Sequence, residues 1–240
     1  MTPLDHMIGY GLLNGSHWFR MMPRLPGQQT GERMGGDDDM NDSHEHGMTE
    51  LVENYREGRR RWGVEDADRR WLRQPLTDWT ACLKGQQAQP QLNPDSTDRL
   101  AVAITETLAI RDGLILSILA PEPGLDDDRL LDLCVRPNDP ANVTALCSIL
   151  DSVFKDSTMQ PDHPRCRAGL VMLEAMAGKA PPGFRSQPLA VASYVDWWSG
   201  GSQASGFAEQ ALADDRSCSL AAIVLALIGR SIDPAWRQSS

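Results

Sequence analysis

The sequence predicts a mainly α-helical protein. Three observations indicate this class: apolar residues recur at intervals of three and four over much of the chain, Pro and Gly interrupt these segments, and one stretch alone carries a β-hairpin signal. The composition is that of a globular protein, with 41% hydrophobic and 23% charged residues. At 240 residues, the chain is long enough to bury a substantial core. We therefore expect a helical bundle.

Residues 1–22 are predicted to form a β-hairpin. Asn14-Gly15 lies between two short apolar and aromatic runs. This dipeptide suits a type I′ turn, because both central residues of that turn take positive φ. An isolated hairpin is marginally stable, so this one should pack on a helix or complete a sheet. The second possibility implies that the hairpin is the remnant of an upstream α/β region missing from this chain.

Residues 23–48 are predicted to be a flexible linker, because they are acidic, rich in Gly and without apolar periodicity. Carboxylate and imidazole side chains gather near its end, and both groups bind divalent metals. They are Asp37, Asp38, Asp39, Asp42, His44, Glu45 and His46. A metal site needs ligands held in fixed geometry, and the spacing of a calcium loop is absent. We therefore predict no metal and no cofactor.

Residues 49–240 are predicted to form the helical domain. Two short charged helices, 53–61 and 65–73, come first, and Pro75 is expected to break the chain after them. Asn93 and Pro94 then begin a long apolar stripe, as a capping residue followed by proline does at a helix start. Gly113 is a candidate break within this stripe. Later helices are expected at residues 126–134, 139–153, 164–178, 189–199, 204–212 and 220–227.

The last three of these helices resemble a tetratricopeptide unit. Gly200-Gly201 is expected to turn the chain between the first two, and the second carries a narrow alanine face that permits close approach of antiparallel helices. That face consists of Ala204, Ala208 and Ala211. One unit alone is visible, and about three are needed for an independent solenoid. We therefore expect this helix pair to complete a bundle.

Two segments resemble a bacterial family known as domain of unknown function 4192. They read LNPDSTDRLAVAITETLAIRDGLI and APPGFRSQPLAVASYVDWWSGGSQASGFAEQALADDRSCSLAAIVLALI, and the likeness covers residues 76–236. The resemblance is to the helical C-terminal half of that family. Family members usually carry an upstream α/β region, and GLLNGSHWF resembles its last hairpin. The resemblance implies no established activity and no catalytic residue.

Charge and hydropathy narrow the possible partners. The net charge is −10, from 23 Lys and Arg against 33 Asp and Glu, so duplex nucleic acid is not an expected partner. Arginine and tryptophan interleave at REGRRRW (56–62) and DRRWLR (68–73), a pattern that can bind single strands, but nearby acids at helical spacing favour a solvated helix face. No apolar run approaches the roughly 18 residues of a membrane span, and the N-terminus lacks secretory features. A cytoplasmic protein without a membrane partner is expected.

The five cysteines are scattered and form no CxxC pair, which indicates reduced thiols rather than a disulfide framework or a zinc site. Cys166 is the one candidate nucleophile. It follows His163 by three residues and is flanked by Arg165 and Arg167, and cationic neighbours stabilise a thiolate. No orienting third group is apparent, so a helix-entry residue is the favoured interpretation.

The favoured function is a non-catalytic scaffold or protein-interaction module. Its helix pairs are expected to present a concave groove to a protein or peptide, with four aromatic side chains as candidate anchors: Tyr194, Trp197, Trp198 and Phe207. In helical proteins such side chains lie more often in the core. The sequence contains no phosphate loop, GxSxG or HExxH motif, so we expect no catalytic residues.

The alternative is an enzyme or ligand-sensing protein whose upstream α/β part is missing. It would use a pocket around Arg111 and Asp112, or around the His163/Cys166 pair. Adjacent residues on a helix do not face one another, so Arg111 and Asp112 are expected to meet different neighbours or to cap a helix end. Polar side chains that converge in a deep pocket would favour this alternative. Tryptophans that line an open groove would favour the scaffold.

Overall fold

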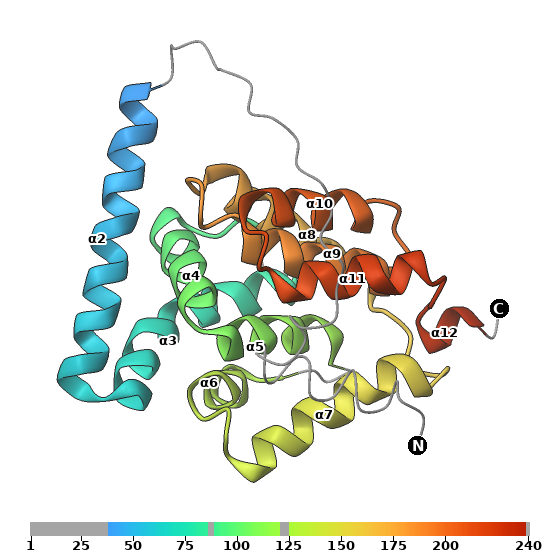
Figure 1. Ribbon diagram of the computed structural model, residues 1–240. Helices are drawn as coiled ribbons and strands as arrows, with labels where there is room; N and C mark the ends of the chain where they lie inside the picture. The colour runs from blue at the N-terminus through green and yellow to red at the C-terminus, as the bar shows by residue number, and fades with distance from the viewer. Residues whose placement is uncertain (1–37, 86–88, 121–124, 239–240) are drawn as a thin grey trace.

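The computed structural model describes residues 38–85, 89–120 and 125–238, and within these ranges every regular element is a helix (Figure 1). The predicted mainly α-helical class is confirmed. The helices are α2 Asp38–Trp62, α3 Val64–Leu83, α4 Pro94–Glu106, α5 Leu108–Leu119, α6 Asp127–Val135, α7 Pro140–Lys155, α8 His163–Lys179, α9 Ser186–Ser199, α10 Ala204–Asp214, α11 Ser219–Gly229 and α12 Ala235–Gln238. The predicted hairpin of residues 1–22 lies outside the described residues, as do residues 23–37 of the predicted linker.

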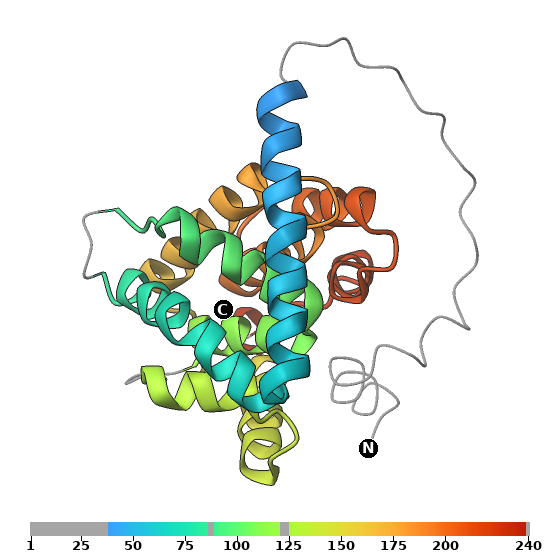
Figure 2. The same ribbon diagram turned by 90° about the vertical axis from the view of Figure 1, so that its left-hand side faces the viewer.

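Helix α2 is longer than predicted. It begins at Asp38, so residues 38–48, expected in the linker, are helical. Met48, Val52 and Tyr55 recur at intervals of four and three, and all three are buried in the core. Once this stripe is anchored, helix extension toward the N-terminus adds one hydrogen bond per residue without a new nucleation cost. In Figure 2, α2 runs lengthwise across the molecule, and its first turns project beyond the helices behind it.

Helix α3 continues through Pro75, where a break was predicted. A proline inside a helix removes one hydrogen bond and costs about 3 kcal/mol. The large apolar residues near this proline in the sequence are almost completely buried: Leu72, Leu76 and Trp79. Burial of each large apolar side chain contributes about 1.5–3 kcal/mol, so their packing outweighs the cost of the proline.

The apolar stripe after Asn93 begins as predicted, because the Asn93 side chain accepts a hydrogen bond from the Ser96 amide at 2.9 Å. It does not divide at Gly113. The break lies at Thr107, whose backbone is extended between α4 and α5 (φ −145°, ψ 103°). Gly113 lies inside α5, and a Cβ atom at this position would collide with Cys134 Sγ on α6. This glycine allows close packing of two helices rather than a turn.

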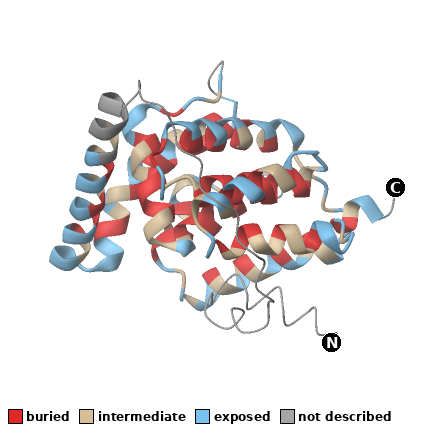
Figure 3. Ribbon diagram, turned by 45° about the horizontal axis from the view of Figure 1, so that its top comes forward, coloured by how far each residue is buried: buried red, intermediate tan, exposed pale blue. Residues whose placement is uncertain are grey.

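Helix α9 forms the centre of the core. Every residue from Ser186 to Trp198 is buried, so no face of this helix is open to water. Neighbours on all sides are required to bury such a helix. Helices α8, α10 and α11 supply most of the contacts, and α4 and α5 supply the others. In Figure 3 the buried residues accordingly concentrate in the interior helices, and exposed residues follow the outer side of α2.

The turn after α9 forms as predicted at Gly200-Gly201. Gly200 ends the helix in the left-handed conformation (φ 79°, ψ 21°), which glycine adopts without strain. Gly201 leaves room for the Asp196 carboxylate, which accepts a hydrogen bond from the Gln203 amide at 2.7 Å. A side chain at position 201 would collide with that carboxylate.

The alanine face of α10 packs against α9 as predicted, and Ala204, Ala208 and Ala211 are all buried. Asp214 at the end of α10 then accepts hydrogen bonds from the Gly183, Arg185 and Ser186 amides at 2.9–3.1 Å. The Arg185 and Ser186 amides lie at the start of α9, where a helix leaves its first N–H groups without intrahelical partners, and Gly183 lies in the turn before it. The likeness of this helix pair to a tetratricopeptide unit stays a prediction.

None of the helices in the described ranges is long and apolar enough to cross a membrane.

Candidate functional site

The four aromatic side chains expected to anchor a partner lie in the core. Tyr194, Trp197 and Trp198 on α9 are 2%, 4% and 1% exposed, and Phe207 on α10 is 7% exposed. Trp197 donates its indole N–H to the Ile232 carbonyl at 3.1 Å, which satisfies its polar atom internally. The prediction of an open groove anchored by these residues is therefore wrong. Their large apolar area is used to pack α9 against its neighbours.

The Tyr194 hydroxyl is buried and makes no hydrogen bond within the described part of the chain. Burial, with a smaller contribution from the charge of Asp112, raises the pKa of Tyr194. The phenol therefore remains protonated at neutral pH, and it is not a candidate base.

Arg111 and Asp112 bind each other directly, contrary to the prediction that each would meet a different neighbour. Arg111 Nε and one terminal nitrogen donate to Asp112 Oδ1 at 2.9 and 2.7 Å. The other terminal nitrogen donates to Gln187 Oε1 on α9 at 3.4 Å. Only a long, flexible arginine can curl back to its neighbour in this way, and water exclusion favours the contact because a buried charge needs a partner.

Asp112 borders a cavity whose other lining residues are Ala109, Gly113, Leu116, Leu133, Pro137, Asn142 and Leu146. The cavity has a volume of about 30 Å³, enough for a water molecule or two. Burial raises the pKa of Asp112, and the charge and hydrogen bonds of Arg111 oppose that rise. This arrangement resembles a paired structural charge more than a substrate pocket.

The His163/Cys166 pair does not form a nucleophile and base. Both lie in the first turn of α8, but His163 is exposed and Cys166 is buried. Burial, followed by the charge of Asp162, raises the pKa of Cys166 to about 12, and Arg165 only partly opposes this. Since the thiolate is the nucleophilic form, this cysteine is unreactive at neutral pH.

The acidic and histidine cluster falls largely on residues whose side chains are not described. His44 Nε2 lies 3.5 Å from Asp98 Oδ1 on α4, which pairs it within the fold. No group of three metal-binding side chains comes together among the side chains that the structure describes.

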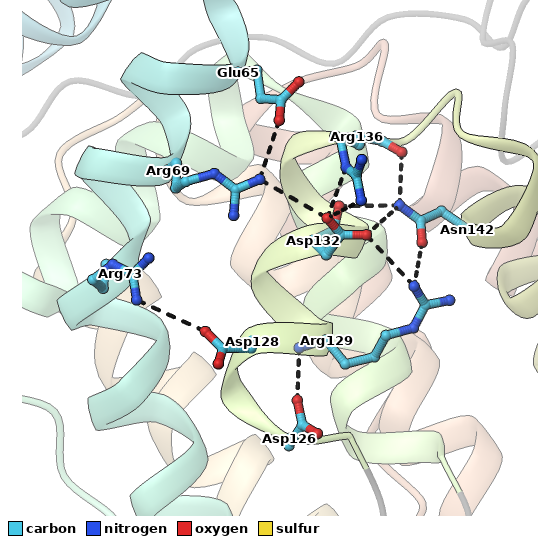
Figure 4. Close-up of polar contacts among 9 residues, drawn as sticks. All are labelled: Glu65, Arg69, Arg73, Asp126, Asp128, Arg129, Asp132, Arg136 and Asn142. Carbon is cyan, nitrogen blue, oxygen red and sulfur yellow. Dashed lines mark hydrogen bonds and ion pairs between the residues drawn. The ribbon is translucent and has the colours of Figure 1, made fainter.

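A network of arginines joins α3, α6 and the start of α7 (Figure 4). At its centre Asp132 receives Arg136 at 2.6–2.7 Å, with Arg129 at 3.5 Å and Arg69 at 3.9 Å. Arg69 also contacts Glu65 at 3.2 Å. Three guanidinium groups thus share one carboxylate.

Asn142 connects this network to the end of α6. Its Nδ2 lies 3.1 Å from both the carbonyl and the carboxylate of Asp132 and 2.9 Å from the Arg136 carbonyl. Its Oδ1 accepts a hydrogen bond from Arg129 at 2.6 Å. Asn142 therefore adds a second hydrogen bond to two carbonyls at the end of α6 that also accept from the Arg136 and Asp139 amides at 2.9 and 3.1 Å. Partial burial acts to raise the pKa of Asp132, but hydrogen bonds from Asn142 and Arg136 and the nearby arginine charges outweigh it and lower the pKa.

Sequence reasoning missed this network. The spacing of Arg129, Asp132 and Arg136 at three and four residues signals contacts along one helix face. Nothing in the sequence pattern indicates that Asn142 joins them, because it comes from the next helix.

Exposed arginine and apolar side chains lie next to one another where α2 ends and α3 begins. We call this the α2–α3 corner and define it by Arg61, Trp62, Val64 and Arg70. Trp62 is 45% exposed and Val64 is 56% exposed. The guanidinium carbons of Arg61 and Arg70 lie 5.4 and 5.0 Å from the Trp62 ring centroid. The corner lies at the lower end of α2 in Figure 1.

Comparison of the chain with known protein families, curated proteins and solved structures finds no match.

Proposed function

We propose that this protein is a non-catalytic helical interaction module that presents an exposed surface to a protein partner. The observation that carries the proposal is the contrast between its buried and its exposed polar groups. Arg111 binds both Asp112 and Gln187 in the interior. At the α2–α3 corner, by contrast, arginine and apolar side chains lie together in solvent.

The enzyme or ligand-sensing alternative has less support. Sites for small molecules are cavities of several hundred Å³ into which a few polar groups converge. The cavity beside Asp112 is about a tenth of that size. The thiol of Cys166 is protonated and buried. The groups that the sequence offered for chemistry are therefore used for packing.

Two further expectations belong to this proposal. A cytoplasmic location is supported by the five cysteines, which are all unpaired and of which four are buried. Membership of the bacterial family domain of unknown function 4192 is proposed on the two segments quoted above, and it leaves the activity open.

Site-specific photo-crosslinking tests the proposal. A photoreactive phenylalanine analogue would replace, one at a time, three exposed apolar residues on separate helices: Val64, Val171 and Ile228. After illumination in cell extract, we expect a discrete protein adduct from position 64 and none from the other two. If adducts form only from position 171 or 228, the protein is still an interaction module, but its binding surface lies on α8 or α11. The lack of any protein adduct at all three positions would overturn the proposed function.

A further inference from the structure

The α2–α3 corner is held in a fixed shape. Gly63 joins the two helices in the left-handed region (φ 81°), where glycine is unstrained. The Trp62 ring folds back over Gly58, where a Cβ atom would come within 3.3 Å of the ring. Arg59 on α2 also binds Asp68 on α3 through two hydrogen bonds of 2.6 and 2.7 Å. A surface that is fixed before binding loses little conformational entropy when a partner arrives.

Two guanidinium groups of the corner have no carboxylate partner within the described ranges of the chain. The neighbouring arginines are paired: Arg59 with Asp68, and Arg69 with Glu65. Arg61 and Arg70, in contrast, form no ion pair with a side chain that the structure describes, and both lie over the Trp62 ring. Both guanidinium groups therefore lie beside one indole ring in a chain whose net charge is −10. Arginine binds carboxylates with two parallel hydrogen bonds, so the pair is complementary to an acidic ligand.

The corner also offers apolar area. Trp62 and Val64 flank Gly63 and are the two most exposed large apolar residues that the structure describes. Tryptophan and arginine are the residues most enriched where binding energy concentrates in protein interfaces. Their combination matches a ligand with carboxylates beside an aliphatic or aromatic side chain.

Acidic side chains around the corner indicate which of two negatively charged partners, a nucleic acid strand or an acidic peptide, fits the corner better. Glu57, Glu65 and Asp66 are exposed on the same two helical turns. A nucleic acid strand places a phosphate at every nucleotide and would pass close to these carboxylates. A peptide can place its few carboxylates opposite Arg61 and Arg70 and its apolar side chains elsewhere. The charge pattern therefore favours a peptide.

We propose that the α2–α3 corner binds an acidic peptide segment of a partner protein, with carboxylates on Arg61 and Arg70 and an apolar side chain against Trp62 and Val64. This inference rests on the proposed function and adds the location and the chemistry of the partner. The small area of the corner predicts a weak, transient complex that weakens as salt rises.

Peptide selection followed by titration tests the inference. A displayed library of random 12-residue peptides would be selected on the 240-residue chain, on an Arg61→Ala/Arg70→Ala variant, and on a matched control, Arg167→Ala/Arg216→Ala. The control removes two exposed arginines from α8 and from the segment before α11. Circular dichroism and thermal unfolding would verify that both variants remain folded.

We expect the parent and the control to enrich peptides with Asp or Glu beside an aromatic or aliphatic residue, and the corner variant to lose that enrichment. In fluorescence anisotropy, the best peptide should bind the corner variant at least about tenfold more weakly than the control. A 12-nucleotide oligothymidine should bind the parent more weakly than the peptide does. The inference is overturned if no acidic peptide is enriched, if the corner variant binds as the parent does, or if oligothymidine binds more tightly. If any of these results occurs and photo-crosslinking gives protein adducts at position 171 or 228, the α2–α3 corner is not the binding surface. The proposed function as an interaction module would then still hold.

Discussion

Replacement of Asn142 by Ala should destabilise the protein, because this side chain joins α7 to the end of α6. Asn142 is 2% exposed, and its Oδ1 and Nδ2 make four contacts with Arg129, Asp132 and Arg136. Its two amide hydrogens and one oxygen allow about three full hydrogen bonds. Each contributes a net stability of about 0.5–1.5 kcal/mol, and the carbonyls left behind partly regain water. The free energy of unfolding should therefore fall by about 2–4 kcal/mol.

The measurement is urea unfolding followed by circular dichroism, with the thermal midpoint as a second readout. A change of 2–4 kcal/mol corresponds to a midpoint roughly 4–16 °C lower in a chain of this size. Thr144→Ala is the matched control on the same helix, since its exposed hydroxyl bonds only the Pro140 carbonyl at 2.8 Å, and it should change stability by less than about 0.5 kcal/mol. A loss of less than 0.5 kcal/mol in Asn142→Ala would refute the structural role assigned to this residue.

Three further predictions follow from the packing and the charges. Gly113→Ala should lower the free energy of unfolding by about 1–3 kcal/mol, because its methyl group meets Cys134 Sγ; unchanged urea unfolding would contradict this close contact. The pKa of Asp132 is lower in the folded protein than its value of about 3.9 in the unfolded chain, so the ionised carboxylate stabilises the fold at pH values above 3.9. This stabilisation is lost as the pH falls through the lower pKa of the folded state. The stability difference between the parent and Asp132→Asn should therefore shrink between pH 5 and pH 2, and a pH-independent difference would argue against the ion pairs. Finally, a thiol reagent should modify Cys147 first in the native protein, since the other four cysteines are buried; equal rates for all five, read by mass spectrometry, would contradict that burial.

Local signals in the sequence predicted the parts of the fold that depend on neighbours in the chain. The helical class, the cap at Asn93 and the turn at Gly200-Gly201 all follow from interactions within about four residues. The cap at Asp139 is another example, with its carboxylate 2.9 Å from the Ala141 amide. Such interactions are fixed by backbone geometry, so residue type and spacing are sufficient to predict them.

The candidate site could be predicted only in part. The cluster of arginine and tryptophan near Trp62 was visible in the sequence, and its interpretation as a solvated helix face agrees with the exposed ion pair of Arg69 and Glu65. Arg59 departs from that interpretation, because it binds the buried Asp68 on the next helix. The sequence did not reveal that Arg61 and Arg70 form no ion pair in the part of the chain that the structure describes. Spacing along a helix gives possible pairs, and the tertiary position of each side chain decides which pairs form.

Tertiary packing decided the features for which local reasoning failed. Pro75 stays inside α3 because Leu72, Leu76 and Trp79 pack around it. The aromatic side chains expected in an open groove are buried because α9 has neighbours on every side. The sequence by itself determined the helical class, the helix start at Asn93 and the turn at Gly200-Gly201. Which faces became buried, and which charges stayed unpaired at the surface, depended on residues far apart in the chain, because burial free energy is gained only when distant segments exclude water together.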